Sequence, residues 1–276
     1  MIGVNRMQMS DKEFQDLSTY IKINFGINLS EKKRSLLMSR LSSLLQTKSF
    51  NSLSEYYDYV VSDNSGIAIS DLVDKITTNH TYFYREKKHF DYLWESVLPE
   101  IVEKQKSQRD IRIWSAGCSS GEEPYTIAML LIEYFSKNPH FWDKKLLATD
   151  ISSKALKIAK KGIYEEENIM NLPTGWKNKY FNKEDDEKYK VKDSVRKEVI
   201  YRRLNLMSPF SFKKKMHVIF CRNVMIYFDN ETTNYLVNQF YNWLEPGGYL
   251  FISHSESLDR RKTNFRYVRP SIYRKD

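Results

Sequence analysis

The stretch RIWSAGCSSGEEPY, residues 112–125, decides the fold class of this chain. A short apolar run ends at Ser115, small residues follow as far as Gly121, and a long apolar helical pattern comes next. A strand, a small-residue turn and a helix in this order are typical of an open α/β sheet, whose ligands bind beyond the carboxyl ends of the strands. Gly117 and Gly121 alone are weak evidence, because glycines also form ordinary tight turns.

Three carboxylates near this turn indicate the kind of ligand. Glu122 and Glu123 open the helix where a P-loop would carry Gly-Lys-Ser/Thr, so they argue against a phosphate site. They could complement the helix dipole or bind a cation. Asp150 ends the next apolar run, 33 residues after Gly117, where a carboxylate can accept hydrogen bonds from a ribose. Together these features predict S-adenosylmethionine, which has positive sulfonium and ammonium groups and no phosphate.

Strand and helix patterns alternate on both sides of this stretch. We expect strands at 111–116, 145–150, 198–203, 217–221 and 248–253, with helices at 122–137, 152–161 and 230–243. This alternation predicts a Rossmann-like α/β domain with a mostly parallel sheet covered on both faces. The last residues predict a terminal antiparallel hairpin that bends at Pro270–Ser271. A charge-dense segment at about 174–200 predicts a small β insertion before the third strand.

The first 78 residues predict a separate all-helical domain. Helical patterns occupy 10–26, 29–46, 52–62 and 67–77, without a strand pattern between them. We therefore expect a helical domain at 1–78, a linker and bridging helix at 79–106, and a cofactor-binding domain at 107–276.

Composition limits the compartment and the partners. Two cysteines among 276 residues cannot form a disulfide framework, which fits a reducing cytosol. Neither a signal peptide nor an apolar run of about 20 residues is present, so we expect a cytoplasmic protein without membrane insertion. The net charge of +9 includes seven basic residues against two acidic ones in 259–276. This excess indicates an acidic partner or only solubility. Metal-ligand spacing is absent, so we expect no metal.

The segment CRNVMIYF, residues 221–228, bears on the methyl acceptor. Enzymes that methylate amino groups of nucleic acids usually carry Asn/Asp-Pro-Pro-aromatic at this position. Here Val224 and Met225 follow Asn223 without a proline. We therefore expect no nucleic acid as substrate. Core packing remains an alternative role for Tyr227.

Several motifs together resemble those of the CheR-type chemoreceptor methyltransferases. In chain order they are TTNHTYFYRE (77–86), SAGCSSGEEPY (115–125), ATDIS (148–152), NLM (205–207), CRNVMIYF (221–228) and PGGYLFISHSES (246–257). The resemblance implies a small all-α domain before a Rossmann-like methyltransferase domain. It also implies methyl transfer from S-adenosylmethionine to glutamate side chains on the cytoplasmic helices of chemoreceptors, which leaves methyl esters and S-adenosyl-L-homocysteine.

The resemblance also implies roles for individual residues. Arg85 would pair with the methionyl carboxylate, and Glu122, which we favour over Glu123, would lie on the ammonium side. Tyr227 would lie close to the transferred methyl group and is the candidate catalytic residue. The complete set of expected cofactor-binding residues is Asn79, Thr81, Arg85, Gly117, Glu122, Asp150, Asn205, Leu206, Arg222 and Asn223.

Receptor recognition would use the second N-terminal helix. By resemblance its basic residues face acidic receptor helices, although such charge runs are usually solvated. The candidates are Lys32, Lys33, Arg34 and Arg40. Family members that dock a receptor pentapeptide carry a glycine-rich loop in the β insertion, whereas residues 176–203 contain no glycine. We therefore expect pentapeptide-independent recognition by a monomer.

Two other functions are consistent with parts of the sequence. One is a nucleic-acid methyltransferase, which the basic tail favours and the missing Pro-Pro motif opposes. The other is a non-catalytic S-adenosylmethionine-binding scaffold, which the intact motif residues oppose. Glutamate is ionised at neutral pH and needs no general base, so the lack of an obvious catalytic His or Cys fits the ester-forming reaction.

Overall fold

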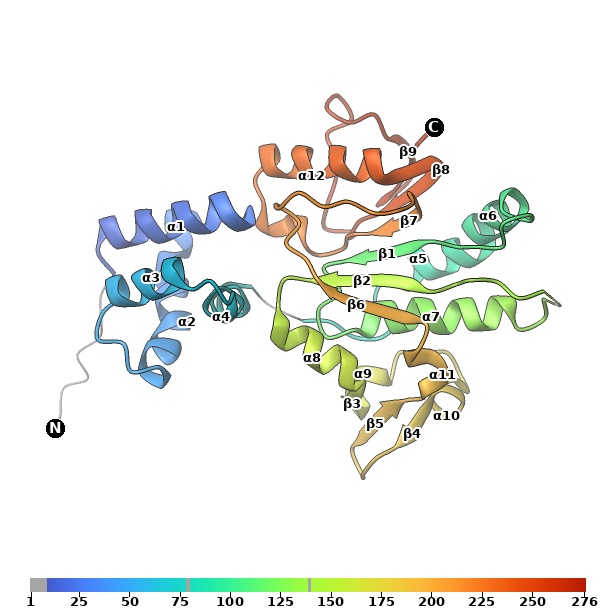
Figure 1. The fold of residues 1–276 in the computed structure, drawn as a ribbon, viewed down its shortest axis with the longest axis horizontal. Helices are drawn as coiled ribbons and strands as arrows, with labels where there is room; N and C mark the ends of the chain where they lie inside the picture. Colours follow the sequence, from blue (N-terminus) through green and yellow to red (C-terminus); the bar gives the residue numbers. More distant parts are fainter. Residues whose placement is uncertain (1–8, 78–79, 139) are drawn as a thin grey trace. The chain divides into compact units, whose positions relative to one another are not determined.

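The computed structural model describes residues 9–77, 80–138 and 140–276 and divides into two compact units (Figure 1). The described residues as far as Thr77 form the first unit together with Tyr227–Asp229, and the remaining residues form the second.

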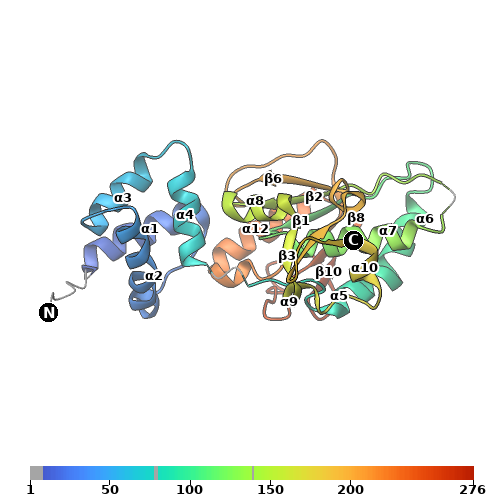
Figure 2. The same ribbon diagram turned by 90° about the horizontal axis from the view of Figure 1, so that it is seen from below.

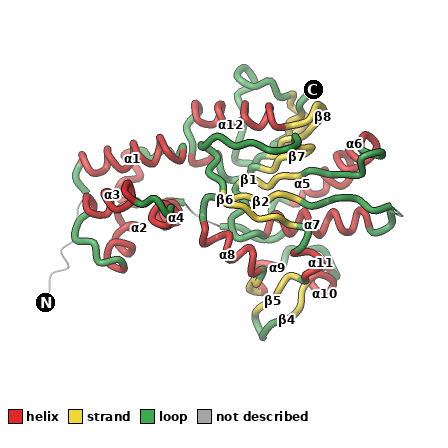
Figure 3. The backbone as a smooth tube through the Cα atoms, in the orientation of Figure 1, coloured by secondary structure: helices red, strands yellow, loops and turns green. Residues whose placement is uncertain are grey.

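The first unit is a bundle of short helices. Helix α1 (Asp11–Phe25) begins with a capping box, in which the Ser10 hydroxyl accepts the Glu13 N–H and the Glu13 carboxylate accepts the Ser10 N–H. It ends at Gly26, whose φ of 71° few other residues tolerate. The chain continues through the 3-10 turn η1 (Glu31–Lys33), α2 (Arg34–Thr47), α3 (Leu53–Ser62) and α4 (Ile67–Ile76) (Figure 3). Fully buried side chains from these helices fill the core, among them Leu17, Ile21, Leu41, Leu45, Tyr56 and Leu72.

The second unit is built on a seven-stranded sheet of order β6-β2-β1-β7-β8-β10-β9. The first five strands in that order run parallel to their neighbours, and the last two form an antiparallel hairpin at one edge. This arrangement confirms the predicted fold class. The strands are β1 (Ile113–Ala116), β2 (Leu146–Asp150), β6 (Val199–Arg203), β7 (Met216–Phe220), β8 (Leu244–Phe251), β9 (Arg266–Arg269) and β10 (Ile272–Arg274).

Helices connect and cover these strands. Helix α7 (Glu122–Phe135) and helix α8 (Ser153–Lys161) each pack against β2 and β6, and α12 (Asn230–Trp243) packs against β8 (Figure 2). The bridging segment is helical from Lys87 to Lys104 but is not a uniform α-helix. A π-helical turn, η2 (Leu93–Val97), separates α5 (Lys87–Tyr92) from α6 (Leu98–Lys104). Pro99 has no N–H to donate, which accounts for the wider turn before it.

A second, three-stranded antiparallel sheet has the order β3-β5-β4. Strands β4 (Phe181–Lys183) and β5 (Lys188–Val191) come from the expected insertion, whereas β3 (Ile163–Glu165) joins them from upstream. Three short helices accompany these strands. Between β3 and β4 the chain forms α9 (Glu166–Ile169) and α10 (Trp176–Tyr180), and after β5 it forms α11 (Asp193–Arg196). β3 is only three residues long, which is too short to give a periodic pattern, so the sequence did not predict this strand.

Strand register places the functional loops at one edge of the large sheet. Ala116 pairs with Thr149, Ser115 with Phe220, and Asp150 with Arg203. Because these strands are parallel, the loops that follow β1, β2, β6 and β7 all leave the sheet at the same edge. The expected cofactor site lies at this edge.

Candidate active site

The loop after β1 closes against the end of β2 in a conformation that requires glycine. The N–H groups of Gly117 and Cys118 both donate to the Thr149 carbonyl, at 2.8 and 2.9 Å. Gly117 has a φ of 82°, and a Cβ atom added there would lie 2.4 Å from Cγ2 of Val224. The backbone therefore runs close to the loop after β7, as expected for a turn that brings its peptide groups up to a ligand.

Replacing Gly117 with alanine should displace this turn and weaken cofactor binding by at least about tenfold. Backbone strain and the clash with Val224 each cost about 1–3 kcal/mol. Gly175→Ala is a matched control, because Gly175 has a φ of 84° but an added Cβ would meet nothing within 4 Å. Calorimetric titration with S-adenosylmethionine would measure both. Adding Val224→Ala to Gly117→Ala should recover part of the affinity, and equal effects of the two glycine variants would contradict a close approach.

Asp150 holds the turn from the end of β2. Its Oδ2 accepts the N–H of Ser119 at 2.7 Å, and its Oδ1 accepts the N–H of Ser152 at 2.9 Å. Ser119 has a φ of 48°, which is uncommon outside glycine. The Asp150 carboxylate therefore fixes both the turn after β1 and the start of α8, and it lies where the sequence predicted the ribose contact.

The two glutamates that open α7 have different partners. Glu123 is an ion-pair partner of Arg222 at 2.9 Å and accepts the Ser115 hydroxyl at 2.7 Å. Glu122 is only 3% exposed and accepts the Ser120 hydroxyl at 2.7 Å. Within residues 9–77, 80–138 and 140–276, Glu122 has no ion-pair partner, and burial raises the pKa of its carboxyl. A buried carboxylate without a cation fits an ammonium ligand, whereas Glu123 is already neutralised.

Arg222 lies at the centre of a buried polar network. Its side chain is 2% exposed and contacts Glu123 Oε2 at 2.9 Å and Glu86 Oε2 at 3.1 Å. It also donates to the main-chain carbonyl of Arg85. These contacts are all with the protein, and the contact of Arg222 with the cofactor stays a prediction. Arg222 joins the chain at Arg85 and Glu86 to the first turn of α7 and thereby positions both.

The loop after β7 is held by a carboxylate that the sequence did not single out. Glu256 accepts the N–H groups of Ser253 at 2.8 Å, Ile226 at 3.2 Å and Asn223 at 3.3 Å. Asn223 has a φ of 59°, and its amide also donates to the Ser253 hydroxyl at 2.8 Å. Glu256 therefore fixes the conformation of the loop that carries Asn223. The sequence signal was available, since Glu256 belongs to the quoted segment PGGYLFISHSES.

The remaining predicted cofactor residues lie on two segments. Asn205 and Leu206 follow β6 and are half-buried, and the Leu204 N–H donates to the Asp150 carbonyl at 3.0 Å. Thr81 and Arg85 are half-buried, and Arg85 donates to the His80 carbonyl at 2.6 Å. The structure thus brings the β6 loop next to Asp150. Asn79 lies outside the described residues.

Tyr227 and the predicted receptor-binding residues belong to the helical unit. The Tyr227 carbonyl accepts the Asn28 N–H at 2.8 Å. Lys32 and Lys33 are exposed. Arg34, in contrast, pairs with Asp11 and lies over the Phe14 ring, and Arg40 donates to the Ile76 carbonyl at 2.9 Å. The two arginines therefore stabilise the bundle, and the two lysines are the better candidates for a partner.

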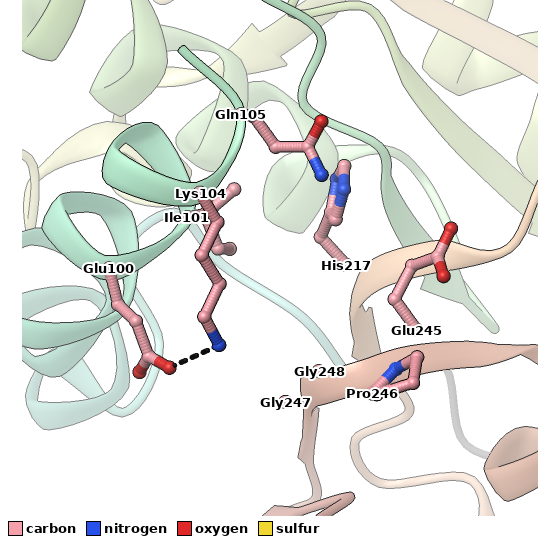
Figure 4. Close-up of a pocket in the computed structure, with 9 residues that line it drawn as sticks. All are labelled: Glu100, Ile101, Lys104, Gln105, His217, Glu245, Pro246, Gly247 and Gly248. Atoms are coloured by element: carbon pink, nitrogen blue, oxygen red, sulfur yellow. Dashed lines mark hydrogen bonds and ion pairs between the residues drawn. The ribbon is translucent and has the colours of Figure 1, made fainter. Parts of the chain in front are cut away.

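A hollow of about 170 Å³ lies elsewhere on the second unit (Figure 4). Its walls come from α6, His217 at the start of β7 and the 245–248 segment of β8, with Lys104 paired to Glu100 at 2.8 Å. His217 and residues 245–248 lie near the amino ends of β7 and β8, which run parallel to β1. The hollow therefore lies at the edge of the sheet opposite Gly117 and Asp150. It is separate from the candidate cofactor site.

Comparisons with known proteins agree with this geometry. Residues 12–77 match the family described as CheR methyltransferase, all-alpha domain, and residues 79–273 match CheR methyltransferase, SAM binding domain. A chemotaxis protein methyltransferase of Borreliella burgdorferi is 51% identical over 95% of this chain and 94% of its own length. A probable chemotaxis protein methyltransferase of Rhizobium etli is 37% identical over 91% and 97%. Chemotaxis protein methyltransferase 2 of Vibrio cholerae is 35% identical over 96% and 92%. Among the described residues, none of the helices has the length and hydropathy of a membrane span.

Proposed function

Because this chain belongs to the CheR methyltransferase family, we propose that it transfers methyl groups to glutamate side chains of chemoreceptors, forming glutamyl methyl esters. The chain is an S-adenosylmethionine-dependent methyltransferase of the chemotaxis type. The observation that carries the site assignment is Glu122, a buried carboxylate without a cationic partner among the described residues, beside the Gly117 turn.

The residues of the second unit suit this cofactor. S-Adenosylmethionine, when bound, supplies the methyl group. Glu122 would hold its ammonium group, Asp150 its ribose and Arg85 its carboxylate. Asn205 and Leu206 would border the adenine, with Gly117, Thr81 and Asn223 completing the pocket. Asn79 lies outside the described residues, and its contact with the cofactor stays a prediction. Arg222 would act by holding Glu123 and Glu86 in place.

The acceptor needs little chemical activation. A glutamate carboxylate with a reference pKa of about 4.3 is already ionised at neutral pH, so no general base is needed. Holding the two reactants in line supplies most of the catalysis that this reaction requires. We propose Tyr227 as a catalytic residue close to the transferred methyl group, as the family resemblance implies. Loss of turnover without loss of cofactor affinity in Tyr227→Phe would support that role.

The function is tested by the chemistry of the product. Incubation of the full chain with receptor-rich membranes and methyl-labelled S-adenosylmethionine should label a receptor-sized protein. Mild base should release the label as methanol, because methyl esters hydrolyse and N-methyl groups do not. Base-stable label on protein would contradict an ester, and label on added DNA or RNA would favour the nucleic-acid alternative. Cofactor binding without label on any acceptor would favour the scaffold alternative.

We propose that Lys32 and Lys33 contact acidic receptor helices without a pentapeptide tether. Reversing both charges, in Lys32→Glu/Lys33→Glu, should raise the KM for receptor about tenfold at low salt and leave cofactor affinity unchanged, because exposed charges mainly guide association. Lys12→Glu/Lys157→Glu changes the net charge equally at two other exposed lysines and is the control. Equal losses in both variants would mean that only net charge matters. A receptor lacking its C-terminal pentapeptide should be methylated at an undiminished rate.

A further inference from the structure

Three potential metal ligands converge beside the Arg222 network. Glu86 precedes α5, His89 lies one turn later on that helix, and His254 comes from the loop after β8. One ligand atom from each residue lies within 4.8 Å of the others. The imidazole rings of the two histidines are 4.6 Å apart between centroids. Nothing in the cofactor site described above uses either histidine.

His89 is a buried side chain without a hydrogen bond. It is 1% exposed, and neither of its ring nitrogens has a hydrogen-bond partner among the described residues. The nearest carboxylate oxygen, Oε2 of Glu86, lies 3.3 Å from Nδ1 but without hydrogen-bonding geometry. Leaving buried polar atoms unsatisfied costs about 1–3 kcal/mol, and such groups in native proteins usually have a specific reason.

The other buried histidine of this unit shows what ordinary burial looks like. His217 is 4% exposed, and its Nδ1 accepts the Arg112 N–H at 3.0 Å. Burial disfavours the charged form of both rings and is the main cause that lowers the pKa of each. Neutral imidazole is the form that binds metals. His217 is satisfied by the protein, whereas His89 lacks a partner.

The surroundings resemble the outer shell of a metal site. Metal-bound histidines usually hydrogen-bond through their second nitrogen, and Nδ1 of His254 lies 3.2 Å from the Ser271 hydroxyl oxygen. Glu86 Oε1 accepts the Ser253 hydroxyl at 2.9 Å. A carboxylate ligand is commonly held in this way.

The local charge also permits a cation. Arg222 is the positive group nearest to Glu86, but it faces two carboxylates, Glu86 at 3.1 Å and Glu123 at 2.9 Å. Two carboxylates and one guanidinium leave a net charge of −1, and a divalent ion beside Glu86 would change it to +1. Arg269 adds a further positive charge near His89. Zinc binds imidazole at about 2.0–2.1 Å and carboxylate at about 2.0–2.2 Å, so the ligand atoms must move together. His254 is exposed and can rotate toward the other two.

We propose that Glu86, His89 and His254 bind one Zn²⁺ ion, with water as the fourth ligand. Two imidazoles and one carboxylate are a ligand set that suits zinc. The ion would link the start of α5 to the loop after β8, two segments that flank the Arg222 network. Spacing along the chain does not reveal this site, because residue 254 is far from 86 and 89.

The test measures metal binding by the full chain without an affinity tag. After treatment with a chelator, Zn²⁺ should bind in a 1:1 ratio with a Kd below about 1 μM, and Co²⁺ should give the visible absorption of a tetrahedral site. His254→Ala should raise the Kd at least about 100-fold, since even the loss of an outer-shell contact costs about 10–100-fold. His254 is exposed, so this variant should fold. His140→Ala, at an exposed histidine elsewhere, should leave the Kd unchanged.

Several outcomes would overturn the proposal. Zinc binding weaker than about 100 μM, or an octahedral Co²⁺ spectrum, would mean that no such site forms. Unchanged affinity in His254→Ala, or an equal loss in His140→Ala, would place the metal elsewhere. Because these readouts do not depend on methyl transfer, they are independent of the proposed enzymatic function.

Discussion

Arg222→Met should lower the free energy of unfolding by about 3–5 kcal/mol, the usual cost of removing one partner from a buried ion pair. The guanidinium is 2% exposed and pairs with both Glu86 and Glu123, whose side chains are 14% and 15% exposed. Methionine keeps the unbranched apolar stem of the side chain, so most of the loss comes from the two carboxylates that are left without a cation. Urea unfolding of the full chain would measure it as a lower midpoint at unchanged m-value.

A matched control separates burial from charge. Lys106→Met also removes a cation from an ion pair, but Lys106 and Glu103 are 66% and 71% exposed. Exposed pairs contribute at most about 1 kcal/mol, so this variant should change little. Arg222→Met/Glu123→Gln should be more stable than Arg222→Met, because one stranded carboxylate becomes neutral. If Arg222→Met were as mild as the control, the network would not hold these segments together.

The strands of the large sheet could be predicted because each is a short apolar run bounded by turn residues. Predicted strand ends agree with the structure within one or two residues for β1, β2, β6 and β7. β8 begins at Leu244, four residues before the expected start at 248, and includes Pro246–Gly248. These residues lie within the strand, where the pairing with β7 shifts register between Met216 and Val218.

The candidate site could be predicted only where its residues directly follow strands. Gly117 and Asp150 stand at strand ends, so their convergence follows from parallel topology. The pairing of Arg222 with Glu86 depends on how distant segments pack, which no local pattern encodes. For the same reason the sequence did not single out Glu256. The assignment of Arg222 to the cofactor stays a prediction. The preference for Glu122 over Glu123 came from the resemblance and stays a prediction, while the structure pairs Glu123 with Arg222.

Asp150→Asn should weaken the binding of S-adenosylmethionine by about 10–100-fold. The carboxylate accepts N–H groups from Ser119 at 2.7 Å and Ser152 at 2.9 Å, and it would also accept the ribose hydroxyls. The amide nitrogen of asparagine cannot accept a hydrogen bond, so one of these N–H groups would face another donor. Hydrogen bonds to a charged group contribute about 1.5–3 kcal/mol each, which corresponds to about 10–150-fold in affinity.

Calorimetric titration should be accompanied by thermal unfolding, because Asp150 also supports the turn after β1. Asp143→Asn is the control, because this exposed aspartate precedes β2. Its side chain accepts the Lys145 N–H at 3.3 Å, which is a weak contact. It should leave cofactor affinity unchanged. If Asp150→Asn lowers stability while a folded fraction binds the cofactor with normal affinity, Asp150 only shapes the turn and does not contact the ribose. Unchanged affinity and unchanged stability would remove it from the site altogether, and the buried Glu122 would then be the principal carboxylate that recognises the cofactor.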